Sequence, residues 1–153
     1  MRGWARRLQR FCRLPSAERR LVLRAVAVHA GVRLKLWRHG LQASDSLLSR
    51  LSREQPQMRY GLDPDRIARL VTSALRERPL RGNCLSESIT LWLLLRRSGH
   101  DCFLRIGARR STTGLEAHAW VEMDGVPLND LADISQQFPP FPASSLPSAG
   151  RVV

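Results

Sequence analysis

Apolar residues in the first half of the chain recur at steps of three or four, which is the repeat of one face of an α-helix. The clearest case covers residues 16–38, where Ser16 can cap the helix and Gly40 follows its end. Its apolar side consists of Leu21, Ala25, Val28, Val32 and Leu36. A weaker pattern over residues 44–54 predicts a second helix. Because each helix is expected to be apolar on one side, both require something to pack against.

Capping signals delimit two further helices. Asp63 is suited to the N-cap position and Pro64 to the first helical position, and the helix that they begin ends before Pro79. Asn83 is the expected N-cap of a fourth helix over residues 84–98. The chain up to this point is therefore expected to be mainly helical.

Beyond the fourth helix, apolar and polar positions alternate, as they do along β-strands. Residues 102–108 and 115–123 predict two strands, and Asp124-Gly125 turns the chain into a third strand over residues 126–131. Helices followed by an antiparallel sheet indicate an α+β fold.

Length and charge narrow the class of protein. A chain of 153 residues suits one domain, and its formal net charge is +12. Residues 1–40 hold eleven basic side chains and one acid, so the positive charge is concentrated there and favours an anionic partner. The longest early uncharged run, residues 25–32, is far shorter than the roughly 18 residues that span a bilayer. No membrane insertion is expected.

Cysteine usage indicates the compartment. The chain has three cysteines and no pattern of a secretory leader, and an odd number of cysteines argues against a disulfide scaffold. We therefore expect the protein to stay in the reducing cytoplasm.

Cys84 has the most reactive setting of the three cysteines. It lies at the first turn of a predicted helix, directly after the N-cap Asn83, where unpaired N–H groups and the helix dipole stabilise a thiolate. The alternative is a small buried apolar residue, which is what most free cysteines are. Cys12, in a basic segment, and Cys102, on the core face of a strand, have no comparable setting.

His118 becomes a candidate base through its distance to an acid on the next strand. If residues 123–125 form a three-residue loop, His118 pairs with Asp130 and their Cβ atoms lie about 4.5–5.5 Å apart. Asp130 can then hold the imidazole tautomer as the third member of a catalytic triad. A two-residue loop, Asp124-Gly125, instead places His118 opposite Leu131 and Asp130 on the other face. A structural histidine and a strand-end acid are the alternative interpretations.

Several stretches of the chain together form a known pattern. They are residues 83–85, the helix end 93–99, the strand 104–107, and above all Ala-His-Ala-Trp-Val-Glu at 117–122, followed by Asp124-Gly125 and Asp130. These stretches resemble the leader peptidases of lasso peptide biosynthesis, which belong to the transglutaminase-like cysteine protease superfamily. Residues 16–21 also look like the opening of that family, so the resemblance covers about residues 14–135.

The resemblance implies a division of the chain into three parts. Residues 1–60 would form a basic N-terminal helical region packed on a transglutaminase- or papain-like core, residues 61–137, with a catalytic helix and a small antiparallel sheet. Residues 138–153 contain four of the nine prolines and are expected to form an irregular or disordered tail.

The resemblance also implies a reaction. Cys84 would be the nucleophile, His118 the general base and acid, and Asp130 the residue that orients His118. The enzyme would remove the leader from a ribosomally synthesised lasso precursor in the bacterial cytoplasm, through an acyl-enzyme. Asn83 stands where a basic residue is expected before the cysteine, and Asn83 and Trp120 are the candidate substrate contacts.

The implied partners are the leader peptide, a separate leader-recognition protein and the ATP-dependent lasso cyclase. The recognition protein is expected to be separate because the chain has no length left for that domain. We expect the basic N-terminus to dock the leader or its recognition protein, through the arginines at positions Arg6, Arg7, Arg10 and Arg13. The alternative is a solvated helix face.

Two other functions fit parts of the sequence. The same triad with an amine acceptor in place of water gives a transglutaminase or another acyltransferase. The basic N-terminus would fit a nucleic-acid-binding protein, but its aromatic residues are sparse and no zinc-finger or recognition-helix pattern is present. The four histidines and three cysteines show no paired spacing of metal ligands, so no metal and no other cofactor is expected.

Overall fold

The computed structural model describes residues 9, 11–39, 60–76, 80, 82–112 and 114–142. Its helices and strands follow one another as α2 (Ser16–His39), α4 (Pro64–Leu75), α5 (Cys84–Arg97), β1 (Phe103–Ser111), β2 (Gly114–Met123), β3 (Val126–Pro127) and α6 (Ile134–Gln137). The three strands form one antiparallel sheet in the order β1-β2-β3. The predicted α+β fold is therefore confirmed, and so are three of the predicted helices; the helix predicted over residues 44–54 lies outside the described residues.

The predicted N-caps begin α4 and α5. The Arg66 backbone N–H donates to Asp63 Oδ1 at 2.8 Å, and the Ser86 N–H donates to Asn83 Oδ1, also at 2.8 Å. Each bond satisfies one of the N–H groups that a helix start leaves unpaired. The Asn83 cap therefore fixes the start of α5, and Cys84 is the first residue of this helix.

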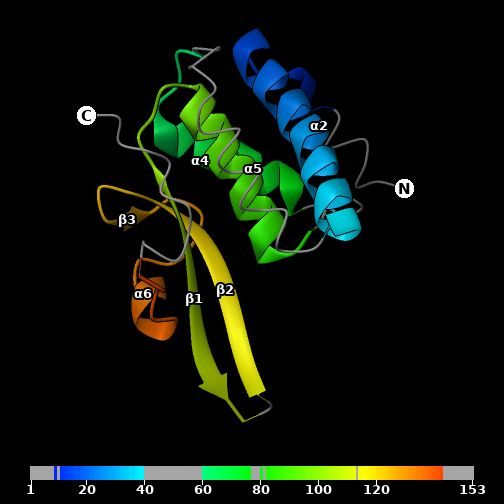
Figure 1. Ribbon diagram of the computed structural model, residues 1–153. Helices are drawn as coiled ribbons and strands as arrows, with labels where there is room; N and C mark the ends of the chain where they lie inside the picture. The colour runs from blue at the N-terminus through cyan, green and yellow to red at the C-terminus, as the bar shows by residue number, and fades with distance from the viewer. Residues whose placement is uncertain are drawn as a thin grey trace, which may run out of the picture.

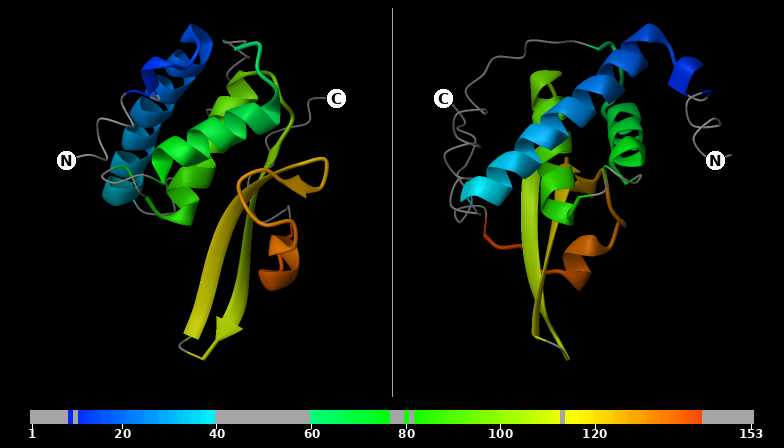
Figure 2. Two further views of the ribbon diagram at one scale, coloured as in Figure 1. Left: turned by 180° about the vertical axis from the view of Figure 1, so that it is seen from behind. Right: turned by 90° about the vertical axis from the view of Figure 1, so that its right-hand side faces the viewer.

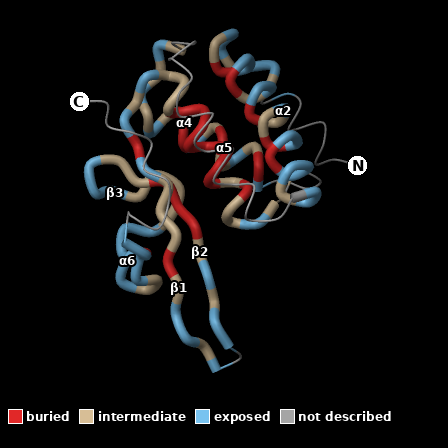
Figure 3. Tube along the Cα trace, in the orientation of Figure 1, coloured by how far each residue is buried: buried red, intermediate tan, exposed pale blue. Residues whose placement is uncertain are grey.

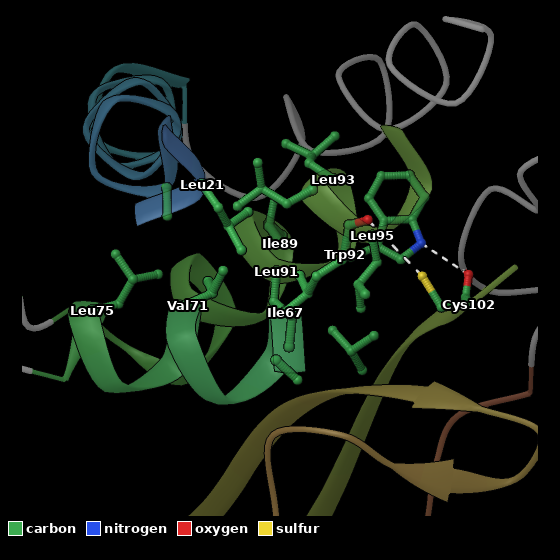
Figure 4. Packing of buried hydrophobic residues seen from close by; sticks show 14 of the residues in the cluster. Leu21, Ile67, Val71, Leu75, Ile89, Leu91, Trp92, Leu93, Leu95 and Cys102 are labelled. Atoms are coloured by element: carbon green, nitrogen blue, oxygen red, sulfur yellow. Dashed lines mark hydrogen bonds between the residues drawn. The ribbon is translucent and has the colours of Figure 1, made fainter. Parts of the chain in front are cut away.

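Helix α5 lies at the centre of the core, between α2 and α4 on one side and the sheet on the other (Figures 1 and 3). Its buried apolar side chains are Ile89, Leu91, Trp92, Leu93, Leu94 and Leu95 (Figure 4). The inward stripe predicted for α2 is confirmed, because Leu21 and Ala25 are fully buried in the same cluster. The Trp92 indole N–H donates to Cys102 O at 3.2 Å, which attaches the second half of α5 to the residue directly before β1 (Figure 4).

Strands β1 and β2 form a long hairpin whose closed end projects away from the helices (Figure 2). Its pairing runs from Phe103 opposite Glu122 to Ser111 opposite Gly114. His118 lies opposite Gly107, about midway along this ladder. The backbone of His118 is therefore fixed by the pairing of β2 with β1.

The hairpin closes with the two-residue loop, so the three-residue register that would pair His118 with Asp130 is wrong. Met123 pairs with Val126 across a two-residue loop in which Asp124 and Gly125 have φ angles of 51° and 79°, as a type I′ turn requires. The strand predicted over residues 126–131 is only two residues long. One further ladder bond follows it, from Leu128 N–H to Val121 O at 2.8 Å, and the chain then leaves the sheet.

The first residues of the predicted irregular tail are ordered. Pro140 forms an isolated bridge with Gly107, and the Phe141 N–H donates to Ile106 O at 2.9 Å. Gly107 permits this approach, because a Cβ atom there would lie 2.9 Å from Pro139 O. The segment from Phe138 to Phe141 therefore lies along the edge of β1, and the rest of the tail from residue 143 lies outside the described residues.

Candidate active site

A pocket of about 400 Å³ brings together the three predicted site residues Cys84, His118 and Asp130. It opens where the start of α5 meets β2 and the segment after β3. The other lining residues are Arg76, Gly82, Glu87, Ala119 and Asn129. Residues from four separate parts of the chain thus meet at the helix start that carries the cysteine.

Of the three cysteines, only Cys84 lines this pocket. It is half-buried as the first residue of α5, and its backbone N–H precedes the first bond of the helix, which Glu87 N–H donates to Asn83 O. Cys12 comes before α2 in the chain and is exposed, whereas Cys102 is buried, with 2% of its surface exposed. Burial raises the pKa of the Cys102 thiol to about 12, so this thiol stays protonated.

His118 and Asp130 are in direct contact. The Nε2 atom of His118 lies 2.6 Å from Oδ2 of Asp130, and the two side chains are 25% and 16% exposed. Because Asp130 engages Nε2, the other ring nitrogen, Nδ1, is the one left for proton exchange in the pocket. The two side chains thus meet although the hairpin has the two-residue loop, in which a continued third strand would place Asp130 on the other face.

Asn129 explains how the pair meets. The Val121 N–H donates to Asn129 Oδ1 at 2.7 Å, in the place where a longer third strand would offer a carbonyl. The Asn129 amide in turn donates to Ser88 Oγ at 3.0 Å, and this hydroxyl donates to Ala119 O at 2.9 Å. The side chain of Asn129 therefore ties the departing chain to α5 and β2, and the next residue, Asp130, turns towards His118.

Two aromatic rings flank His118. The Trp120 ring lies 6.4 Å away between centroids and nearly parallel, and the Phe138 ring lies 5.2 Å away. The Arg109 guanidinium covers Phe138 at 4.4 Å from the ring centroid. Trp120 is fully buried and does not line the pocket, so it supports the imidazole and does not reach a bound substrate.

Asn83 and Arg13, which the sequence also predicts as contacts, are not among the residues that line this pocket. Asn83 uses its side-chain oxygen to cap α5, and it lines a neighbouring pocket of about 320 Å³ together with Arg33 and Trp37 of α2. Arg13 is exposed, and the other three arginines predicted to dock a partner lie outside the described residues.

Sequence reasoning missed His29, which holds the segment in front of Cys84. This side chain of α2 is 1% exposed; its Nε2 bonds Leu80 O at 3.0 Å, and its Nδ1 lies 3.2 Å from Thr90 Oγ1 on α5. A Cβ atom on Gly82 would lie 2.9 Å from the same ring, so only glycine fits there. The one signal in the sequence is that His29 occupies a position on the inward side of the predicted helix, where an apolar residue is expected.

Stability is expected to depend on pH through His29. Burial is the main cause that lowers the pKa of this imidazole, and the positive charge of Arg33 lowers it further. The hydrogen bond to Leu80 O and the negative charge of Glu87 act in the opposite direction. As pH falls below about 6.5, the unfolded chain binds a proton that the folded chain resists, so the free energy of unfolding falls. His29→Gln keeps a donor for Leu80 O but cannot titrate. Urea unfolding at pH 7 and pH 5 should show a smaller loss for His29→Gln than for the wild type; equal losses would contradict this assignment.

Comparison with known proteins identifies a family model, described as the transglutaminase-like superfamily, that matches residues 25–142. This match includes the whole pocket. No curated protein and no solved structure matches the chain. In the part of the chain that the structure describes, no helix is long and apolar enough to cross a membrane, and no group of His, Cys, Asp and Glu residues could hold a metal ion.

Proposed function

Because the chain belongs to the transglutaminase-like superfamily, whose members are commonly cysteine proteases or acyltransferases, we propose that it is a cysteine peptidase acting on a lasso precursor peptide. The observation that carries this proposal is the His118–Asp130 pair in one pocket with a cysteine at a helix start. A nucleophile, a base and a group that orients the base are the three parts that covalent hydrolysis of an amide requires.

In the proposed reaction, His118 Nδ1 takes the proton of the Cys84 thiol, and Sγ attacks the scissile carbonyl carbon. The imidazolium then gives this proton to the leaving amine as the C–N bond breaks, which leaves a thioester on Cys84. Water loses a proton to Nδ1, attacks the thioester and releases the carboxylate, and the thiol regains its proton. Asp130 stays on Nε2 throughout and stabilises the imidazolium.

The backbone N–H of Cys84 is the proposed oxyanion donor. It precedes the first intrahelical hydrogen bond of α5, so it is one of the N–H groups that a helix start leaves without a helical partner. The α5 dipole adds positive potential at the same point, where negative charge develops on the carbonyl oxygen.

The proposed substrate is the bond between leader and core of a ribosomally made precursor, with a separate recognition protein presenting the leader. The free amine produced on the core is the group that an ATP-dependent cyclase requires. The pattern from Ala117 to Glu122 around His118 supports this class of substrate. Incubation with a candidate precursor and its recognition protein should give leader and core fragments by mass spectrometry; an uncut precursor in the presence of an active partner would contradict the proposal.

Acyl transfer is the second candidate, because the same superfamily contains acyltransferases and the same thioester can be attacked by an amine. Adding a primary amine to the precursor reaction separates the two. A peptidase gives mostly the free leader carboxylate, whereas a transferase gives a leader amide that is heavier than the carboxylate by the mass of the amine less one water.

Alkylation of the thiols gives a test that needs no substrate. We expect Cys84 to react fastest with iodoacetamide at neutral pH, because it lines one pocket with His118, the proposed base for its thiol. Cys102 should react only when the protein unfolds, since it is 2% exposed and burial raises its pKa to about 12. Peptide mapping after short exposures measures the three rates, and a faster reaction at the exposed Cys12 would contradict an activated Cys84.

A further inference from the structure

Helix α2 carries a second apolar stripe, which is exposed, besides the one that packs into the core. The inward stripe is buried, yet Leu23, Leu34 and Trp37 are 60%, 54% and 83% exposed, and Trp37 lies at the margin where α2 borders the pocket lined by Asn83. Ala27 and Ala30 are exposed between them, so positions 23, 27, 30, 34 and 37 follow the alternating steps of four and three that form the seam between two packed helices. We call these five residues the α2 seam.

Basic residues border the α2 seam on both sides. The exposed cations of the helix are Arg19, Arg20, Arg24, Arg33, Lys35 and Arg38. Its one acid, Glu18, is buried and bonds Arg66 of α4 at 2.8 Å, so it does not offset this charge. The outer face of α2 is therefore an apolar line between two basic borders.

We propose that the α2 seam binds an amphipathic helix of another protein that has acidic side chains on both borders of its own apolar stripe. Charge decides against a second copy of this chain, because two α2 faces would bring like charges together. Residues 1–8, 40–59 and 143–153 each contain more basic than acidic side chains, so these segments of the chain do not supply the opposite charge either. This inference does not depend on the proposed peptidase activity.

The shape of the seam favours a helix over a lipid surface. Leu23 lies towards one end, Leu34 and Trp37 lie at the other, and two alanines lie between them. Small residues at the middle let a second helix approach closely and seat a large side chain between the leucines. A membrane-surface helix instead gains affinity from a broad apolar face, to which the alanines contribute little.

The test uses the full chain and a synthetic 21-residue helix, a length on the order of three heptads, with leucines at seam spacing and glutamates on both borders. A matched probe has the same composition with the leucines moved off the seam. Fluorescence anisotropy should show at least tenfold tighter binding of the first probe, and this binding should weaken as salt rises. Equal binding of both probes, or no binding of either, would overturn the proposal.

Matched variants locate the contact. Leu34→Ser should weaken binding of the seam probe at least tenfold, while Leu115→Ser, at the exposed end of the hairpin, should leave it unchanged. Circular dichroism checks that both variants fold. Three outcomes would show that the α2 seam binds something other than a helix of another protein and would overturn the proposal. They are tighter binding to phosphatidylglycerol vesicles than to the seam probe, tighter binding to single-stranded RNA than to the seam probe, and self-association of the wild type that Leu34→Ser removes.

Discussion

Replacing Cys84 by alanine is expected to abolish cleavage of the precursor, with a loss of at least about 10³-fold in kcat/KM. The thioester cannot form without Sγ, and a methyl group cannot receive the acyl group. Cys84→Ser should be almost as inactive, because the hydroxyl is a far weaker acid than the thiol and the helix start cannot make up the difference. Mass spectrometry of the precursor over a time course measures the loss.

The other two cysteines provide the control. Cys12→Ala, at an exposed position, should retain full activity. Cys102→Ala should also cleave at the wild-type rate, although removing a buried sulfur lowers the melting temperature, so it is assayed well below that temperature. Full cleavage by Cys84→Ala would end the peptidase proposal, and it would leave the docking of a helix on the α2 seam unaffected.

The parts of the fold that sequence reasoning predicted well are those with local causes. Asp63 and Asn83 each place an oxygen where the first turn of a helix needs one, so the starts of α4 and α5 follow from a few neighbouring residues. The position of Cys84 at a helix start follows from the same short stretch. The alternation of residues 115–123 likewise predicts β2, which spans Gly114–Met123.

The parts that it predicted poorly depend on residues far apart in the chain. The turn at Asp124-Gly125 closes with two residues, and in that register a continued third strand would place Asp130 on the face opposite His118. What brings Asp130 to His118 is the Asn129 amide bonding Val121 and Ser88, which requires α5 to be already packed on the sheet. Phe138 against His118, and His29 against Leu80, are contacts of the same long-range kind.

Replacing Asp130 by alanine is expected to lower kcat by about 10²- to 10⁴-fold with little change in KM. The carboxylate bonds His118 Nε2 at 2.6 Å through Oδ2 and accepts from the Leu131 N–H at 2.9 Å through Oδ1, so its loss frees the ring to rotate and removes the negative charge that stabilises the imidazolium. The kcat of Asp130→Asn should lie between those of the wild type and Asp130→Ala, because the amide Oδ1 can still accept from the Nε2 N–H of His118 but carries no charge. Steady-state kinetics on the precursor separates kcat from KM.

Two further variants distinguish orientation of the ring from general damage to the fold. Asp133→Asn removes an exposed carboxylate outside the pocket and should leave kcat unchanged. Asn129→Ala keeps the Asp130 carboxylate but leaves the Val121 N–H and the Ser88 hydroxyl without their amide partner, so kcat should fall together with the melting temperature. Asp130→Ala, in contrast, should lose kcat at a nearly unchanged melting temperature. If Asp130→Ala instead cleaved the precursor at the wild-type rate, the contact with His118 would be structural, and the proposed enzyme would work with the cysteine and histidine alone.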